Sequence, residues 1–209
     1  FGHDAATKMK GGSNGGFFSG QMHPLVTPGN YTARLNVNGA VLETPIEVRA
    51  DPRIELSQQD YAAKTKLLLE LRDLLSQTNL MINNANTYKA QLADLKEKLE
   101  SNQTLDKALS TEIDTATDKL SNVLDDILKR PPPSMSYRQR PRIREEIRSV
   151  MRAVNSAWAK PTQPQISRLE ELKGEVAQAE SMLNQIISSD ISAINDGTKS
   201  IPQISVGKK

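Results

Sequence analysis

The stretch from Ser57 to Ser101, SQQDYAAKTKLLLELRDLLSQTNLMINNANTYKAQLADLKEKLES, decides the fold of this 209-residue chain. Its mostly apolar seam recurs at spacings of four and three residues, which is typical of packed helices. The seam consists of Leu67, Leu71, Leu74, Thr78, Met81, Ala85, Tyr88, Leu92, Leu95 and Leu99. Ser57 and Asp60 have the spacing of a capping box, so we predict one helix of about 40 residues that begins near Gln58 and has a weak point at the asparagines 83, 84 and 86.

A second helix follows after a short link. The segment Ser101-Asn102-Gln103-Thr104 supplies a stop and a new cap, and an apolar seam then continues from Leu105 to Ile127. A link this short predicts antiparallel packing of the two helices. The three prolines at 131–133 end the second helix and open a stiff, exposed loop.

Two more helices complete the helical part. Pro141 is expected in the first turn of a shorter third helix, which ends near Trp158. The fourth helix ends at Asp196-Gly197, where we expect a left-handed glycine cap. The sequence thus predicts an antiparallel bundle of about four long helices over residues 54–196, packed within one chain or across a dimer, and a flexible tail over residues 197–209.

A different periodicity precedes the bundle. Apolar and polar residues alternate on both sides of Asn38-Gly39, which is the preferred dipeptide of a type I′ turn, so residues 31–53 are predicted to form an antiparallel β-hairpin that ends at Pro52. Residues 1–30 contain most of the glycines and form a Gly-rich arm or loop. The fold class is therefore mainly α with a small β part.

The hairpin needs a cover, because an isolated two-stranded hairpin is only marginally stable in water. Three covers are open: strands from residues 1–27, the helices, or another molecule. We interpret the hairpin as part of an incomplete Ig-like sandwich.

The composition argues against an enzyme. The chain has no cysteine, two histidines and a net charge of +2, and no apolar run approaches the roughly 20 residues that span a bilayer. His3 and His23 lie in the arm without carboxylates at ligand spacing, and the adjacent carboxylates of the helices point in different directions. We expect no catalytic residues, no metal, no cofactor and no small-molecule substrate.

The strongest local signal is a cluster of arginines over residues 130–152. Seven arginines and two glutamates give these 23 residues a net charge of +5. Arg144, Arg148 and Arg152 are four residues apart, so we expect one stripe opposite the apolar seam of Ile143, Ile147 and Val154. Three roles remain open for the stripe. It could pair with acidic residues of the next helix, namely Glu170, Glu171, Glu175 and Glu180, or bind an acidic partner or an anionic lipid surface. It could also bind nucleic acid, although the region has few aromatic residues that could stack on bases. The candidate partner-binding residues are Phe17, Phe18, Arg138, Arg140, Arg142, Arg144, Arg148 and Arg152.

One family resemblance adds to this interpretation. The segments TPGNYTARL (27–35), VNG (37–39) and VRADPR (48–53) resemble the segment that closes a small sandwich in bacterial sortilin-like β-propeller proteins, in which a helical C-terminal region follows. The propeller itself is absent, so the resemblance supplies no catalytic positions. It implies a periplasmic or extracellular location and a binding role.

Together these patterns predict a non-catalytic accessory or scaffolding subunit of a larger protein complex, including a membrane-bound one. Its contacts would be made by the arm, the hairpin and the Arg-rich loop. The alternatives are a C-terminal fragment of a larger secreted propeller-type hydrolase or receptor, and a binder of anionic lipid or nucleic acid through the Arg stripe.

Overall fold

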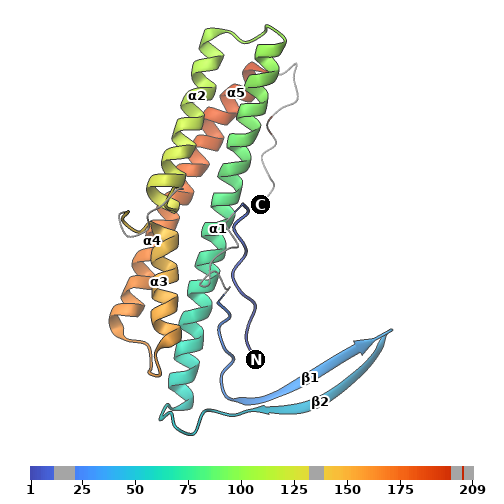
Figure 1. Cartoon of the computed structure of the whole chain (residues 1–209), viewed down its shortest axis with the longest axis vertical. Helices are drawn as coiled ribbons and strands as arrows, with labels where there is room; N and C mark the ends of the chain where they lie inside the picture. The colour runs from blue at the N-terminus through green and yellow to red at the C-terminus, as the bar shows by residue number, and fades with distance from the viewer. Residues whose placement is uncertain (12–21, 132–138, 199–203, 205–209) are drawn as a thin grey trace.

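A computed structural model describes residues 1–11, 22–131, 139–198 and 204. The chain is mainly helical with a two-stranded antiparallel hairpin, which confirms the predicted fold class (Figure 1). In chain order the elements are β1 (Gly29–Val37), β2 (Ala40–Val48), α1 (Gln58–Ser101), α2 (Lys107–Asn122), η1 (Val123–Leu128), α3 (Ile143–Ser156), α4 (Gln163–Gln185), η2 (Ile186–Ile191) and α5 (Ser192–Gly197), where η marks a π-helical segment.

The helices form a rod with α1 as its longest member. α2 and η1 descend along the C-terminal half of α1, α3 continues in the same direction along its N-terminal half, and α4, η2 and α5 return along both (Figure 1). The Lys96–Asp114 ion pair, at 2.6 Å, joins α1 to the antiparallel α2. The predicted antiparallel packing is therefore confirmed, and it occurs within one chain.

The seam of α1 supplies much of the core. Every one of its predicted positions is buried, and Leu71 and Leu92 are fully so. The capping box forms as predicted, because the Ser57 hydroxyl accepts from the Asp60 amide at 3.1 Å and the Asp60 carboxylate accepts from the Ser57 amide at 3.2 Å. The helix continues without a break past the asparagines at 83–86.

Two π-helical segments interrupt the α-helical spacing. Buried positions of the last helix follow one another at three or four residues as far as Ile186, and the next is Ile191, five residues on. A π-turn accommodates one more residue than an α-turn, so η2 keeps Ile191 in the core. η1 extends α2 in the same way, with Val123 and Leu128 both buried.

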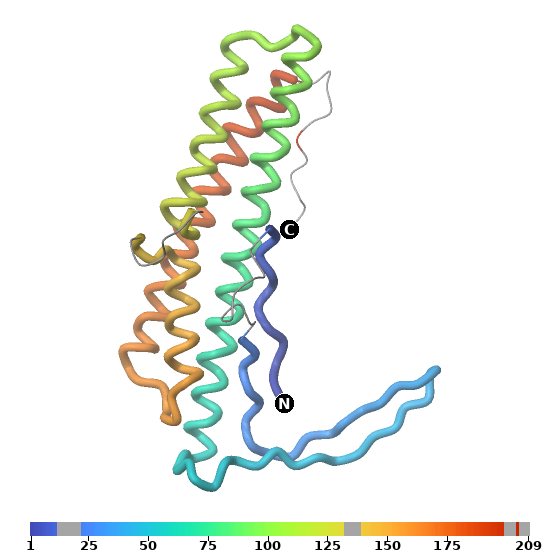
Figure 2. Tube along the Cα trace, viewed as in Figure 1, coloured from blue at the N-terminus to red at the C-terminus, as the bar shows by residue number. Residues whose placement is uncertain are grey.

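The hairpin projects from the end of the rod (Figures 1 and 2). Asn38 and Gly39 have φ angles of 49° and 86°, which confirms the type I′ turn, and Leu35 lies directly opposite Leu42. None of residues 29–48 belongs to the buried core. Of the three covers considered, the described part of the arm and the helices supply none.

Several boundary predictions were wrong. Pro141 lies outside α3, because Arg142 occupies the cap position and the helix begins at Ile143. The last helix ends at Gly197 as predicted, but its cap is Thr198 with φ −118° rather than a left-handed glycine. Ile204, placed in a flexible tail, is buried, and Asn195 both accepts from its amide and donates to its carbonyl.

Candidate partner-binding surfaces

The first candidate surface is one face of the hairpin. The register places most of its apolar residues on the same side of the sheet, where Leu42 is 67% exposed and Leu35 57% exposed. We call this set the apolar hairpin face: Tyr31, Ala33, Leu35, Val37, Ala40, Leu42, Ile46 and Val48. The opposite face is mostly polar and includes the Arg34–Glu43 ion pair at 2.6 Å. A sheet with one apolar face normally buries that face. Because the described parts of the chain do not cover it here, the apolar hairpin face is available for docking.

The hairpin also has one edge that is fit for strand pairing. Pro45 has no N–H to donate, so it must occupy an outward-facing position of β2 and interrupt the outer edge of that strand. β1 contains no proline and extends over nine residues, about 30 Å at 3.4 Å per residue. The outer edge of β1 is therefore the better template for an added strand.

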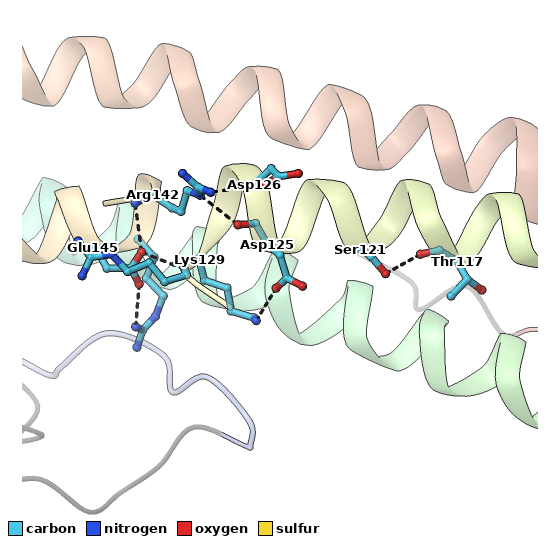
Figure 3. Close-up of polar contacts among 9 residues, drawn as sticks. Thr117, Ser121, Asp125, Asp126, Lys129, Arg142 and Glu145 are labelled. Carbon is cyan, nitrogen blue, oxygen red and sulfur yellow. Dashed lines mark hydrogen bonds and ion pairs between the residues drawn. The ribbon is translucent and has the colours of Figure 1, made fainter. Parts of the chain in front are cut away.

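The Arg cluster has a structural part at the base of the Pro-rich loop (Figure 3). The backbone amides of Arg130 and Arg142 both donate to Oε2 of Glu145, each at 3.2 Å, and so bring the two ends of the loop together. The Arg142 guanidinium donates to the Asp125 carbonyl at 3.0 Å and approaches Asp126 at 3.4 Å. Arg142 thus fastens α3 to the end of η1 and is not free for a partner.

Arg144 is half-buried rather than presented to solvent, so the expected stripe opposite the seam is wrong at this position. Its Nε donates to Oδ1 of Asn79 on α1 at 2.9 Å, and its side chain is only 18% exposed. Burial lowers the pKa of Arg144, the nearby Arg148 lowers it further, and Glu145 opposes the shift. At 100° per residue, Arg144 lies only about 60° from the centre of the buried seam, whereas Arg152 lies about 140° away.

The remaining arginines are available. Within the described parts of the chain, no ion pair involves Arg140, Arg148 or Arg152, and Arg140 and Arg152 are exposed. The acidic residues considered as their partners interact with other side chains. Glu171 and Glu175 pair with Arg168, Glu170 pairs with Lys173, and Glu180 accepts a hydrogen bond from Gln77. Pairing with the next helix therefore does not neutralise the stripe. Phe17, Phe18 and Arg138 lie outside the described residues.

The arm lies on α1, which the sequence did not indicate. Residues 4–10 run along α1, and residues 22–28 return beside the first residues of the chain (Figure 2). The two segments are joined through the Gly2–Leu25 bridge and the His3 amide, which donates to the Pro24 carbonyl at 2.7 Å. Thr65 donates to the carbonyl of Leu25 at 3.3 Å. Ala6 and Pro24 are buried in this contact. The described parts of the arm are therefore engaged with the bundle.

Two grooves lie between the helices of the bundle. One, of about 520 Å³, lies beside the end of η1 and the start of α3. Its three arginines, Arg140, Arg142 and Arg168, match in number its three carboxylates, Asp126, Glu146 and Glu175. The other, of about 320 Å³, lies between η1 and η2, and the Lys119–Asp190 ion pair is part of its wall.

Neither metal clusters nor membrane spans are found in the residues that the structure describes. No three His, Asp or Glu side chains gather there in a metal-binding arrangement. None of the helices described is long and apolar enough to cross a bilayer.

Comparison with known proteins gives no match. No protein-family model, no curated protein and no solved structure is similar to this chain. Its function is therefore inferred from the surfaces described above.

Proposed function

We propose that this protein is a non-catalytic accessory subunit, located outside the cytoplasm, that docks on a larger protein complex through its β-hairpin. The observation that carries the proposal is the uncovered apolar hairpin face, with Leu35 and Leu42 paired and exposed at its centre. An exposed apolar face of this kind is typical of a surface that contacts another protein or a membrane. The resemblance of residues 27–53 to a sandwich-closing segment supports both the location and the binding role.

The partner that fits is a β-sheet. A partner strand at the outer edge of β1 would satisfy its free main-chain groups, and the partner's apolar side chains would cover the apolar hairpin face. The rod of helices would then act as a rigid spacer, since the hairpin projects from one of its ends. Arg140, Arg148 and Arg152 would add charge contacts along the side of the rod.

A second candidate places the covering sheet in the same polypeptide, as in the propeller proteins that the chain resembles. The uncovered apolar hairpin face favours this second candidate as well, because a sheet of the same polypeptide could cover it. Mass measurement of the protein from its native source separates the two: a chain near 23.1 kDa that co-migrates with a large complex supports an accessory subunit, whereas recovery only within a longer polypeptide supports the second candidate.

A pair of double variants tests the hairpin directly. Leu35→Asp with Leu42→Asp places two charges on the apolar hairpin face, and Asn36→Asp with Val41→Asp places two charges on the opposite face of the same strands. We expect the first pair to reduce co-purification with the native complex at least tenfold, because buried charges oppose docking. We expect the second pair to leave co-purification within twofold of the wild type.

The hairpin must remain formed for this comparison. Cross-strand nuclear Overhauser contacts between Ala33 and Thr44, which lie opposite each other, check this in both variants. Equal loss of the complex in both variants, or retention in both, would contradict docking through the apolar hairpin face.

A further inference from the structure

The hydrogen bonds described between residues 4–10 of the arm and α1 all reach main-chain atoms of the arm. Arg72, Ser76, Asn79 and Asn83 are spaced four, three and four residues apart, so they lie on one face of α1. We call these four residues the backbone-reading face. Their hydrogen bonds reach the Asp4 carbonyl at 3.2 Å, the Thr7 amide at 3.0 Å, the Thr7 carbonyl at 2.7 Å, the Lys8 carbonyl at 3.1 Å and the Lys10 amide at 2.7 Å.

The two carboxamides suit this task because each presents one donor and one acceptor, as a peptide group does. Asn83 uses both, donating to the Lys8 carbonyl and accepting from the Lys10 amide. It therefore holds an extended segment much as a neighbouring β-strand would.

Asn79 is oriented by a positioning residue. Arg144 is a donor only, so the Asn79 oxygen must face it, and the Asn79 Nδ2 is then directed at the Thr7 carbonyl. Arg144 on α3 thus sets the orientation in which Asn79 binds the arm.

Two side chains of the arm add apolar packing to these hydrogen bonds. Ala6 is buried and Met9 packs partly against the core, whereas Asp4, Thr7, Lys8 and Lys10 are exposed. The site therefore selects an extended main chain with a small residue at the position of Ala6 and an apolar residue three positions later.

We propose that the backbone-reading face is a binding site for an extended peptide, that residues 4–10 are its resident ligand, and that the same segment of a second copy of the chain can replace them. Every group that the site recognises belongs to the segment itself, so the same contacts form when the segment comes from another molecule. Exchange of identical segments between copies conserves all the hydrogen bonds. The tether favours the closed chain by raising the effective concentration of its own arm. This site is independent of docking through the hairpin.

Two full-length variants separate the ligand from the site. Ala6→Arg with Thr7→Pro disrupts the arm, because an arginine does not fit at the buried position of Ala6 and proline has no N–H to donate to Ser76. Asn79→Ala with Asn83→Ala spoils the site and leaves the arm sequence intact. The probe is a fluorescent synthetic peptide of residues 2–11.

We expect the peptide to bind the arm-spoiled chain with saturation, and to bind at least tenfold more weakly when the two asparagine substitutions are added. A peptide carrying Ala6→Arg should not bind. Mixing the arm-spoiled and site-spoiled chains should give a heterodimer in analytical ultracentrifugation, while each alone stays monomeric.

Three results would overturn the proposal. Absence of saturable peptide binding up to millimolar concentration, or equal binding with and without the asparagines, would remove the peptide site. Peptide binding without heterodimer formation would overturn exchange with a second copy.

Discussion

At the scale of single residues, Arg144 and Arg152 show how one sequence pattern yields two environments. Both belong to the same predicted stripe, yet Arg144 is half-buried and bonded to Asn79 while Arg152 is exposed. Arg144 lies at the border of the seam, where a long side chain reaches the neighbouring helix. Its burial lowers its pKa, but a guanidinium remains charged at neutral pH.

Replacing each of these arginines by leucine tests their different roles. Arg144→Leu should lower the free energy of unfolding by about 1–2 kcal/mol, because Asn79 loses a charged donor in a half-buried site. Arg152→Leu should change it by less than about 0.5 kcal/mol. Urea denaturation measures both, and hydrogen exchange at the Thr7 amide should quicken only in Arg144→Leu. Equal effects of the two substitutions would show that Arg144 does not position Asn79.

Asn83 marks a limit of what the sequence could predict at this scale. Asparagine has a low helix propensity, so residues 83–86 are read as a weak point in a long helix. In the structure Asn83 forms hydrogen bonds with the main chain of Lys8 and Lys10, which are more than 70 residues away in sequence. Nothing in the local spacing indicates such a partner, because an extended arm has no periodicity that could pair it with a helix.

At the scale of elements, the spacing of apolar residues predicted where the helices run, but it did not predict the two π-helical segments. Ile191 is fully buried, but it follows the buried Ile186 by five residues and so does not fit a spacing of three or four. That gap of five between two otherwise regular stretches is the signal that could have revealed η2. Local capping was more predictable, since the Ser57 and Asp60 pair depends only on neighbours in sequence.

Single-residue deletions test the π-turn. Deleting Ser188 inside η2 shortens the gap between Ile186 and Ile191 to four residues, so a plain α-helix still points both side chains into the core. We expect this variant to stay folded, with a thermal midpoint within a few degrees of the wild type. Circular dichroism melting measures it.

Ser181 is a matched control, because it is an exposed serine in the preceding α4. Its deletion rotates Leu183 and Ile186 by about 100° relative to the residues before it, and misplacing a buried aliphatic side chain costs about 2–5 kcal/mol. A large loss of helix stability is therefore expected for this deletion alone. If deleting Ser188 proves as harmful as deleting Ser181, the π-turn has a role beyond keeping the register.

At the scale of the whole molecule, the order of elements was predictable but their arrangement around α1 was not. The seams identify four helices, yet a seam does not say which neighbour it meets. In the structure α2 packs along one half of α1 and α3 along the other half, and the Glu145 contacts bring together the ends of the loop between them. Pairing over such distances depends on tertiary contacts that no local pattern encodes.

The same scale separates the hairpin from the rod. The hairpin adds no residue to the buried core, so its folding and that of the bundle should be energetically independent. Gly39→Val tests this, because a β-branched residue strains a backbone held at φ 86° and the hairpin has little stability of its own. We expect the cross-strand contacts of β1 and β2 to disappear from nuclear magnetic resonance spectra and co-purification with the native complex to fall with them. The melting midpoint of the helices should stay within about 2 °C of the wild type, since the substitution leaves the core intact. A lower midpoint would mean that the hairpin supports the rod, and its apolar face would then have to be explained by folding rather than by a partner.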